Sequence, residues 1–236
     1  MKKRKKLIII IIIISIILIS LVITFISAYS RYLYPTGEVI SGIYTIKVDN
    51  PYNNASMGNF FLISAGEKYI AIDTGADSKH SEIQLNRLGI SPNDIIAVFI
   101  THSDWDHIGS LPLFTQATIY TSVTEFQYMN TARFTSLTTI PELPHIIIND
   151  GEIIELYCRT IKCIYTPGHT SDSVSFLVDD KYLFVGDLFI NPNLARYDTE
   201  LQVLHRNMVL DIDGVEYIFT GHFGLFKDVR FFRWWY

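Results

Sequence analysis

The sequence predicts one α/β domain that follows a single long apolar helix at the N-terminus. Two patterns predict the domain: short runs rich in β-branched and aromatic residues recur from Val39 onward, and helical stretches interrupt them. A third pattern, an uncharged stretch from Leu7 to Ser30, predicts the helix. Of the 236 residues, 49% are hydrophobic and 18% are charged, which excludes a disordered chain.

The N-terminal stretch has the length of a membrane anchor. Leu7 to Ala28 is dominated by Ile and Leu, and as a helix it extends roughly 33 Å, enough to cross a bilayer core. Five cations at residues 2–6 precede it and Arg31 follows it, which predicts that the N-terminus is cytoplasmic and the rest extracytoplasmic. We therefore expect residues 1–30 to form a basic tail and a single-pass signal anchor that contacts membrane lipid.

A cleaved signal peptide is the alternative interpretation of the same stretch. Ala28-Tyr29-Ser30 fits a small-x-small cleavage site, and cleavage would release a secreted protein. We favour the anchor because the apolar region of a cleaved signal is usually only about 7 to 15 residues long. Both interpretations export residues 31–236, which we take as one domain because no Gly-, Ser- or Pro-rich linker divides them.

The domain is predicted to contain many short strands and few helices. The expected strands are Val39–Val48, Asn59–Ser64, Lys68–Asp73, Ile95–Thr101, Thr118–Thr121, Ile146–Ile148, Ile153–Tyr157, Lys162–Tyr165, Val174–Val178, Tyr182–Val185 and Tyr217–Thr220. Ser81–Leu88 and Glu200–Asp211 are expected to be helices. On the second, Thr199 and Gln202 match a capping box, and four residues lie on one predicted apolar face: Leu201, Leu204, Met208 and Val209. Met129–Leu143 has no clear period and is expected to form a loop or a small helical insertion.

The exported region is acidic. Removing the five cations at residues 2–6 from the 19 Lys and Arg leaves 14 against 24 Asp and Glu, a net charge of about −10. Such a domain repels polyanions, so we expect a small-molecule substrate rather than nucleic acid.

Potential metal ligands follow several of the predicted strands. His102, Asp104, Asp106 and His107 come directly after Ile95–Thr101. The two carboxylates would repel each other strongly if buried without cations, and a metal ion would neutralise them. Each of three later strands is followed by a glycine and one His or Asp, namely His169, Asp187 and His222. The remaining histidines, His80, His145 and His205, lack this context and are assigned to the surface or to ordinary packing.

These segments resemble the metallo-β-lactamase superfamily. The matching pieces are Ile72-Asp73-Thr74-Gly75, the run Thr101-His102-x-Asp104-x-Asp106-His107-x-Gly109, Pro167-Gly168-His169-Thr170, Gly186-Asp187-Leu188-Phe189 and Thr220-Gly221-His222. They occur in the family's order over roughly residues 38 to 225. The resemblance implies a four-layer αββα sandwich with two metal ions at one edge, and a hydrolase that uses a metal-bound hydroxide.

The resemblance also assigns a role to each of these residues. The first metal site would use His102, Asp104 and His169. The second would use Asp106, His107 and His222, with Asp187 bridging both. Asp73 would lie behind the ligands and hold one of them in place. Asp106 would also be catalytic by helping to orient the hydroxide.

One residue departs from the family pattern. The usual motif is His-x-His-x-Asp-His, and here Asp104 replaces the second His. A third carboxylate makes the centre less positive, so it should acidify a bound water less. It also shifts the metal preference from Zn²⁺, which we still expect, toward Mn²⁺ or Fe²⁺.

The resemblance leaves alternatives for the reaction. An ester, lactone or amide is the expected substrate class; Asp187 argues against penicillin hydrolysis because the β-lactamases proper lack an Asp there. The flavodiiron reductases carry a carboxylate at the position of Asp104 but need a flavin domain, for which this chain has no room. DNA-uptake channel proteins carry a related His-x-Asp-x-Asp-His motif, which keeps a phosphodiesterase or nuclease as an alternative. A non-catalytic metal-binding protein is the third.

The two cysteines allow a disulfide. If Thr160-Ile161 formed a two-residue turn, Cys158 and Cys163 would lie opposite each other at a spacing a disulfide tolerates. Neither residue of that turn favours positive φ, and a longer loop would separate the sulfurs, so buried free thiols are the alternative.

Overall fold

The computed structural model describes residues 15–20, 36–48, 58–130, 142–190 and 197–227. The chain divides into two compact units, residues 1–35 and 36–236. In the first unit residues 15–20 are helical, and the rest of the predicted anchor Leu7–Ala28 lies outside the described residues. A search of the described ranges finds no helix with the length and hydropathy needed to cross a membrane.

The first sheet of the second unit has seven strands in sequence order. They are β1 (Gly37–Ile40), β2 (Ile43–Ile46), β3 (Phe60–Ala65), β4 (Lys68–Ile72), β5 (Ile95–Phe99), β6 (Thr118–Thr121) and β7 (His145–Ile147). The strands from β1 to β4 pair antiparallel, whereas those from β4 to β7 pair parallel. The carboxyl ends of β4 and β5 therefore lie at the same edge of this sheet.

The second sheet has six strands, in the order β13-β12-β11-β10-β9-β8. They are β8 (Ile153–Leu156), β9 (Arg159–Tyr165), β10 (Val174–Val178), β11 (Tyr182–Phe184), β12 (Tyr217–Thr220) and β13 (Gly224–Phe226). Because β9 and β11 are each antiparallel to β10, and β12 is parallel to β11, the strands β9, β11 and β12 share one direction.

The described helices are few and short. They are α2 (Ser78–Arg87), α3 (Trp105–Ile108), α4 (Val123–Met129) and α6 (Thr199–Leu210), with 3-10 turns at Pro92–Asp94 and Leu111–Leu113. Asp77 caps α2, since its side chain accepts a hydrogen bond from the His80 N–H, and the helix therefore begins three residues before the predicted Ser81.

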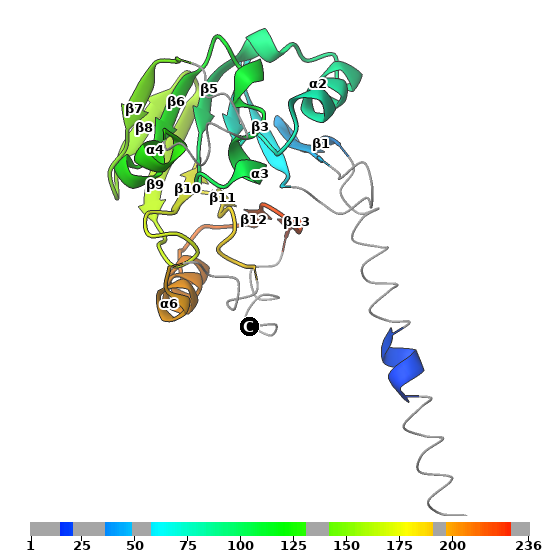
Figure 1. The fold of residues 1–236 in the computed structure, drawn as a ribbon, viewed down its shortest axis with the longest axis vertical. Helices are drawn as coiled ribbons and strands as arrows, with labels where there is room; N and C mark the ends of the chain where they lie inside the picture. Colours follow the sequence, from blue (N-terminus) through cyan, green and yellow to red (C-terminus); the bar gives the residue numbers. More distant parts are fainter. Residues whose placement is uncertain (1–14, 21–35, 49–57, 131–141, 191–196, 228–236) are drawn as a thin grey trace, which may run out of the picture. The chain divides into compact units, whose positions relative to one another are not determined.

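Alternation along the strands builds a core on both faces of each sheet. Aromatic side chains meet between the sheets: Phe61 contacts Phe184 and Phe219 at ring-centroid distances of 5.4 and 5.3 Å. Neighbouring strand residues point the other way: Leu62 packs in a cluster with Leu85 of α2, and residues of β10 to β12 pack with α6. The layers are thus helix, sheet, sheet and helix (Figure 1), as the resemblance implied.

Two features of the secondary structure differ from the sequence prediction, and a third prediction is not tested. The expected strand Val39–Val48 is a hairpin, β1 and β2, whose chain reverses at Ser41-Gly42, where Gly42 adopts a φ of +75°. The strand β13 and the short helices α3 and α4 were not predicted, because each is too short to show a period. Met129–Leu143 falls largely on residues 131–141, outside the described part.

The prediction of the inner face of α6 was right for Val209 and wrong for Leu204 and Met208. Asp198, not Thr199, is the N-cap, and its side chain accepts from the Leu201 N–H at 2.9 Å. Leu204 and Met208 are exposed. The residues that α6 buries are Gln202, Arg206, Val209 and Leu210. Two polar side chains thus occupy positions that an apolar pattern reserves for aliphatic ones.

The hairpin that carries the cysteines also differs from the prediction. In the β8–β9 register Leu156 faces Arg159, so the turn is Tyr157-Cys158 rather than Thr160-Ile161. Cys158 is therefore in the turn and exposed, whereas Cys163 is buried in β9 opposite Phe176. Both thiols are free.

Candidate metal centre

The polar segments singled out in the sequence converge at one edge of the two sheets. Asp73 follows β4, and His102 comes shortly after β5. His169, Asp187 and His222 follow β9, β11 and β12, the three strands of the second sheet that run in one direction. The Val174 N–H donates to the Thr101 carbonyl at 2.8 Å and so joins the two sheets at this edge.

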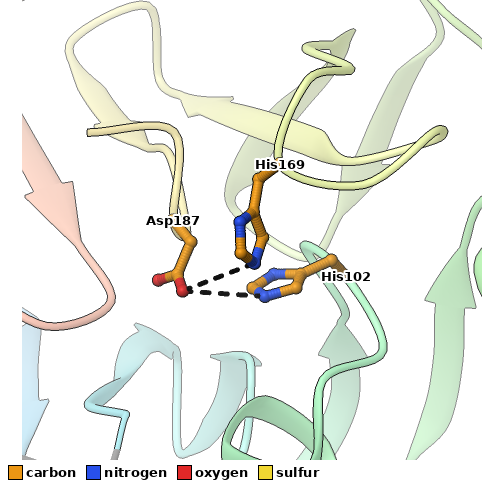
Figure 2. Close-up of side chains that lie close together, drawn as sticks. All are labelled: His102, His169 and Asp187. Atoms are coloured by element: carbon orange, nitrogen blue, oxygen red, sulfur yellow. Dashed lines mark ion pairs between the residues drawn. The ribbon is translucent and has the colours of Figure 1, made fainter. Parts of the chain in front are cut away.

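The first group contains the predicted ligands of the first site. The His169 Nε2 lies 3.1 Å from Asp104 Oδ2 and 3.7 Å from Asp187 Oδ2. The His102 Nε2 lies 3.6 and 3.9 Å from the same two oxygens. Figure 2 shows His102 and His169 pointing at the Asp187 carboxylate. The ligand atoms of His102, His169 and Asp187 lie within 4.8 Å of one another. Asp104 is not part of that set, but its carboxylate faces the two imidazoles.

The second group lies on the other side of Asp187. The His107 Nε2 is 3.3 Å from Asp187 Oδ1, and the His222 Nε2 is 3.2 Å from Asp187 Oδ2 and 3.4 Å from Asp106 Oδ2. One ligand atom each from Asp106, His107 and His222 lies within 4.8 Å of the others. The carboxylate of Asp187 thus contacts histidines of both groups, as expected of a bridging residue.

Residues behind the two groups fix the imidazole rings. Asp73 accepts from the Thr101 N–H and O–H, each at 2.8 Å, and lies 2.8 Å from His107 Nδ1. His107 therefore donates through Nδ1 and presents Nε2 to the site. Because the Thr101 hydroxyl donates to Asp73, it accepts from His102 Nδ1 at 3.0 Å, which leaves His102 Nε2 free as well. The predicted role of Asp73 thus agrees with its contacts.

Burial and charge separate the protonation states of these groups. Burial, together with His107, lowers the pKa of His102, and burial, together with His102, lowers that of His169 to about 4. Burial also acts to lower the pKa of His107, but Asp187 and Asp73 outweigh it and raise this pKa well above its usual value. Burial acts to raise the pKa of Asp187, whereas His107 and His222 hold it well below its usual value. Without a metal ion, both shifts favour the charged forms of His107 and Asp187, whose Nε2 and Oδ1 atoms lie 3.3 Å apart.

Orphaned polar atoms show that the site fits metal ions. His102 Nε2 is buried without a hydrogen-bond partner, and His107 Nε2 and Asp187 Oδ1 are buried with only each other, 3.3 Å apart. All three atoms belong to the groups of possible ligand atoms. Such atoms cost free energy unless a cation or water satisfies them. The backbone of Gly221 also packs closely against two of these residues. A Cβ at this position would lie 2.6 Å from His107 Cε1 and 2.7 Å from Asp187 Oδ1, so only glycine fits there. Histidine nitrogens and carboxylate oxygens are the donors that Zn²⁺, Mn²⁺ and Fe²⁺ accept.

The polar inner face of α6 supports Asp187. Gln202 Nε2 donates to the carbonyls of Asp187 and Leu188, and Arg206 donates to those of Leu188 and Ile190. The segment Asp187–Ile190 leaves these carbonyls without a strand partner, and buried carbonyls need donors. This requirement explains why α6 turns polar side chains inward.

Sequence reasoning also missed two residues that contact the ligand loops. His205, assigned to the surface or to ordinary packing, lies with its Nδ1 2.8 Å from the Pro167 carbonyl, two residues before His169. Glu125, in the unpredicted α4, contacts residues next to His102 and His169.

The sequence profile of the metallo-β-lactamase superfamily matches residues 53–222, more than half of the chain. The chain belongs to the metallo-β-lactamase superfamily. A solved metallo-β-lactamase family protein from Thermus thermophilus has the same fold, with a TM-score of 0.68 at 21% identity over 82% of this chain and 77% of that one. The predicted αββα architecture and family are therefore confirmed.

Curated relatives match this chain over only about half of their own length. A lactamase-like protein of Aspergillus fumigatus is 28% identical over 72% of this chain and 51% of its own length. A hydroxyacylglutathione hydrolase of Francisella philomiragia is 30% identical over 64% of this chain and 55% of its own. The chain thus spans about half the length of these relatives.

Proposed function

We propose that this protein is a metal-dependent hydrolase that binds two divalent ions and cleaves an ester, lactone or amide bond. The observation that carries the proposal is the position of Asp187 between two groups of ligand atoms, His102, Asp104 and His169 on one side and Asp106, His107 and His222 on the other. Ions bound there would supply Lewis acidity and a water of lowered pKa. Zn²⁺ is the expected metal, with Mn²⁺ and Fe²⁺ as alternatives because of Asp104.

The residues of the chain prepare the site for that chemistry. Hydrogen bonds from His102 and His107 to Thr101 and Asp73 fix the rings before any ion arrives. Asp106, whose side chain is 16% exposed and lies 3.4 Å from His222, would accept a hydrogen bond from the attacking water and so orient it. The names of the relatives support a hydrolase. Because one of them is a hydroxyacylglutathione hydrolase, acyl compounds are the first candidate substrates to test.

We further propose that the hydrolase is anchored in the cell membrane by Leu7–Ala28, with residues 31–236 outside the cytoplasm. The length of the apolar stretch and the five cations before it support this arrangement. Secretion after cleavage near Ala28 is the alternative.

Hydrolysis by the purified full-length chain tests the function. We expect turnover of a neutral thioester, ester or lactone. The variants His107→Ala and Asp187→Ala should retain less than about 1% of it, since loss of a ligand should exceed the 10- to 100-fold typical of groups behind the ligands. His80→Ala is the matched control, because His80 belongs to α2 and lies outside both ligand groups; it should keep full activity.

The pattern of substrates decides between the reaction classes. Faster cleavage of a bis-aryl phosphodiester than of any acyl substrate would replace the proposal by the phosphodiesterase alternative. Two bound metal ions with no turnover of either class would indicate a non-catalytic metal-binding protein.

A further inference from the structure

Glu125 is buried next to both loops that supply the first group of ligands. The residue lies in α4, outside every motif of the family pattern, and its side chain is fully buried. Its Oε2 accepts from the Ser103 N–H at 2.8 Å and from the Ser103 hydroxyl at 2.5 Å. Its Oε1 accepts from the Thr170 hydroxyl at 2.6 Å.

These contacts link two segments that are far apart in the sequence. Ser103 lies between His102 and Asp104 in the loop after β5, and Thr170 follows His169 in the loop after β9. The two loops belong to different sheets, so a single carboxylate ties the two sheets together beside the first group. Thr170 is held further by Ser173, whose hydroxyl contacts both its N–H and its hydroxyl.

A buried carboxylate is costly to keep without a compensating partner. Within the part of the chain that the structure describes, no Lys, Arg or His nitrogen lies within ion-pair distance of Glu125. Its charge is compensated by three short hydrogen bonds, which are stronger to a carboxylate than to a neutral acceptor. An aliphatic side chain would fill the same space but could not hold the two loops, whereas the carboxylate bonds to both.

We infer that Glu125 is a positioning residue that holds His102, Asp104 and His169 in the geometry that binds the first metal ion. It acts through Ser103 and Thr170 and does not touch the ion. Ser103 and Thr170 are direct sequence neighbours of His102, Asp104 and His169. Neither Ser103 nor Thr170 directly neighbours a residue of the second group, Asp106, His107 and His222. Loss of Glu125 should therefore weaken one metal site and spare the other. This inference rests on the proposed two-metal function.

Zinc titration of the full-length chain in detergent, against a chromophoric chelator, tests the inference. In a His222→Ala background, which impairs the second group, Glu125→Ala should lower zinc affinity about 10-fold or more. In a His102→Ala background, which impairs the first group, the same change should alter affinity by less than about twofold. Tyr165→Phe is the control, since it removes a hydrogen bond to the Ile148 carbonyl that involves no residue of either group and no partner of Glu125, and it should change neither affinity.

A conservative variant separates hydrogen bonding from charge. In Glu125→Gln the amide oxygen can accept from Ser103, and its NH₂ can donate to the Thr170 hydroxyl, which can in turn donate to Ser173. We expect this variant to restore the first-site affinity to within about threefold of the parent. Equal losses in the Gln and Ala variants would overturn positioning by hydrogen bonds.

Smaller changes keep the test valid if Glu125→Ala does not fold. Ser103→Ala and Thr170→Val each remove one hydroxyl donor, and each should weaken the first site about threefold. Unchanged first-site affinity in these variants, or equal loss at both sites, would overturn the inference. Failure of the parent chain to bind two zinc ions would instead contradict the proposed function.

Discussion

In the metal-free protein the surroundings of His107 favour its protonated form, whereas burial favours the neutral forms of His102 and His169. Asp187 and Asp73 raise the pKa of His107 well above its usual value, and burial lowers the pKa values of the other two. A metal ion binds only the neutral ring, so an ion must displace the proton of His107 but none from His102 or His169. The two groups of ligands therefore differ in their response to pH.

This difference predicts proton release on metal binding. At pH 7 the second group should release about one proton per chain from His107 as zinc binds, and its zinc affinity should rise with pH until His107 is neutral in the free protein. The affinity of the first group should be nearly independent of pH above about 6, since the pKa of His169 is only about 4. A pH indicator in weakly buffered protein measures the release. Equal pH dependence of both sites would contradict these protonation states.

Asp104 sets the charge of the centre. Its Oδ2 lies 3.1 and 3.6 Å from the Nε2 atoms of His169 and His102, so it faces the first group. The variant Asp104→His removes one negative charge, and we expect it to retain zinc more tightly. Because a more positive centre would lower the pKa of a metal-bound water, the acidic limb of the pH–rate profile should shift to lower pH. An unchanged limb, or one at higher pH, would contradict the charge argument.

Among the elements, strands and the residues that follow them could be predicted, but the inner face of α6 could not. Short apolar runs bounded by turn residues marked most strands, and each ligand follows one of them. On α6 the aliphatic pattern pointed to Leu204, yet Gln202 and Arg206 face inward. The cause is that the buried carbonyls of Asp187–Ile190 need hydrogen-bond donors, which Gln202 and Arg206 supply. This tertiary contact cannot be predicted from the local sequence of the helix.

The same limit applies to Glu125. Its importance depends on Ser103 and Thr170, which the fold brings to it from two sheets. The residues next to Glu125 in the sequence do not indicate that it contacts Ser103 and Thr170. The candidate ligands could be proposed from the sequence because each lies in a dense or glycine-flanked motif. The residues that contact their loops lie elsewhere in the sequence.

The β8–β9 hairpin predicts different reactivity for the two cysteines. Cys158 is exposed in the turn, and burial raises the pKa of the Cys163 thiol to about 12. An alkylating reagent at pH 8 should modify Cys158 rapidly and Cys163 only after unfolding. Mass spectrometry of the labelled peptides measures both. Denatured, unreduced protein should contain two free thiols, and their absence would show that a disulfide forms after all.

For the whole molecule, the apolar N-terminal stretch predicts where the domain resides. If Leu7–Ala28 anchors the chain with its basic end inside, protease added to intact cells should reach the domain or the junction near Arg31–Glu38. A tagged cytoplasmic protein serves as the control for intact cells. Full protection that is lost only on lysis would contradict the proposed topology.

The two sheets together make the site, since neither contributes all the ligands. The first sheet supplies His102 through His107, and the second supplies His169, Asp187 and His222. The central claim is that this shared edge holds two ions with Asp187 between them.

The metal content after equilibrium dialysis, measured by inductively coupled plasma mass spectrometry, tests that claim most directly. The full-length chain dialysed with zinc, manganese or iron should retain about two ions per chain. Asp187→Ala should lose both, because its carboxylate faces both groups, and His80→Ala should retain both. A chain that retains none of the three metals, or an Asp187→Ala variant that still holds two ions, would contradict the account.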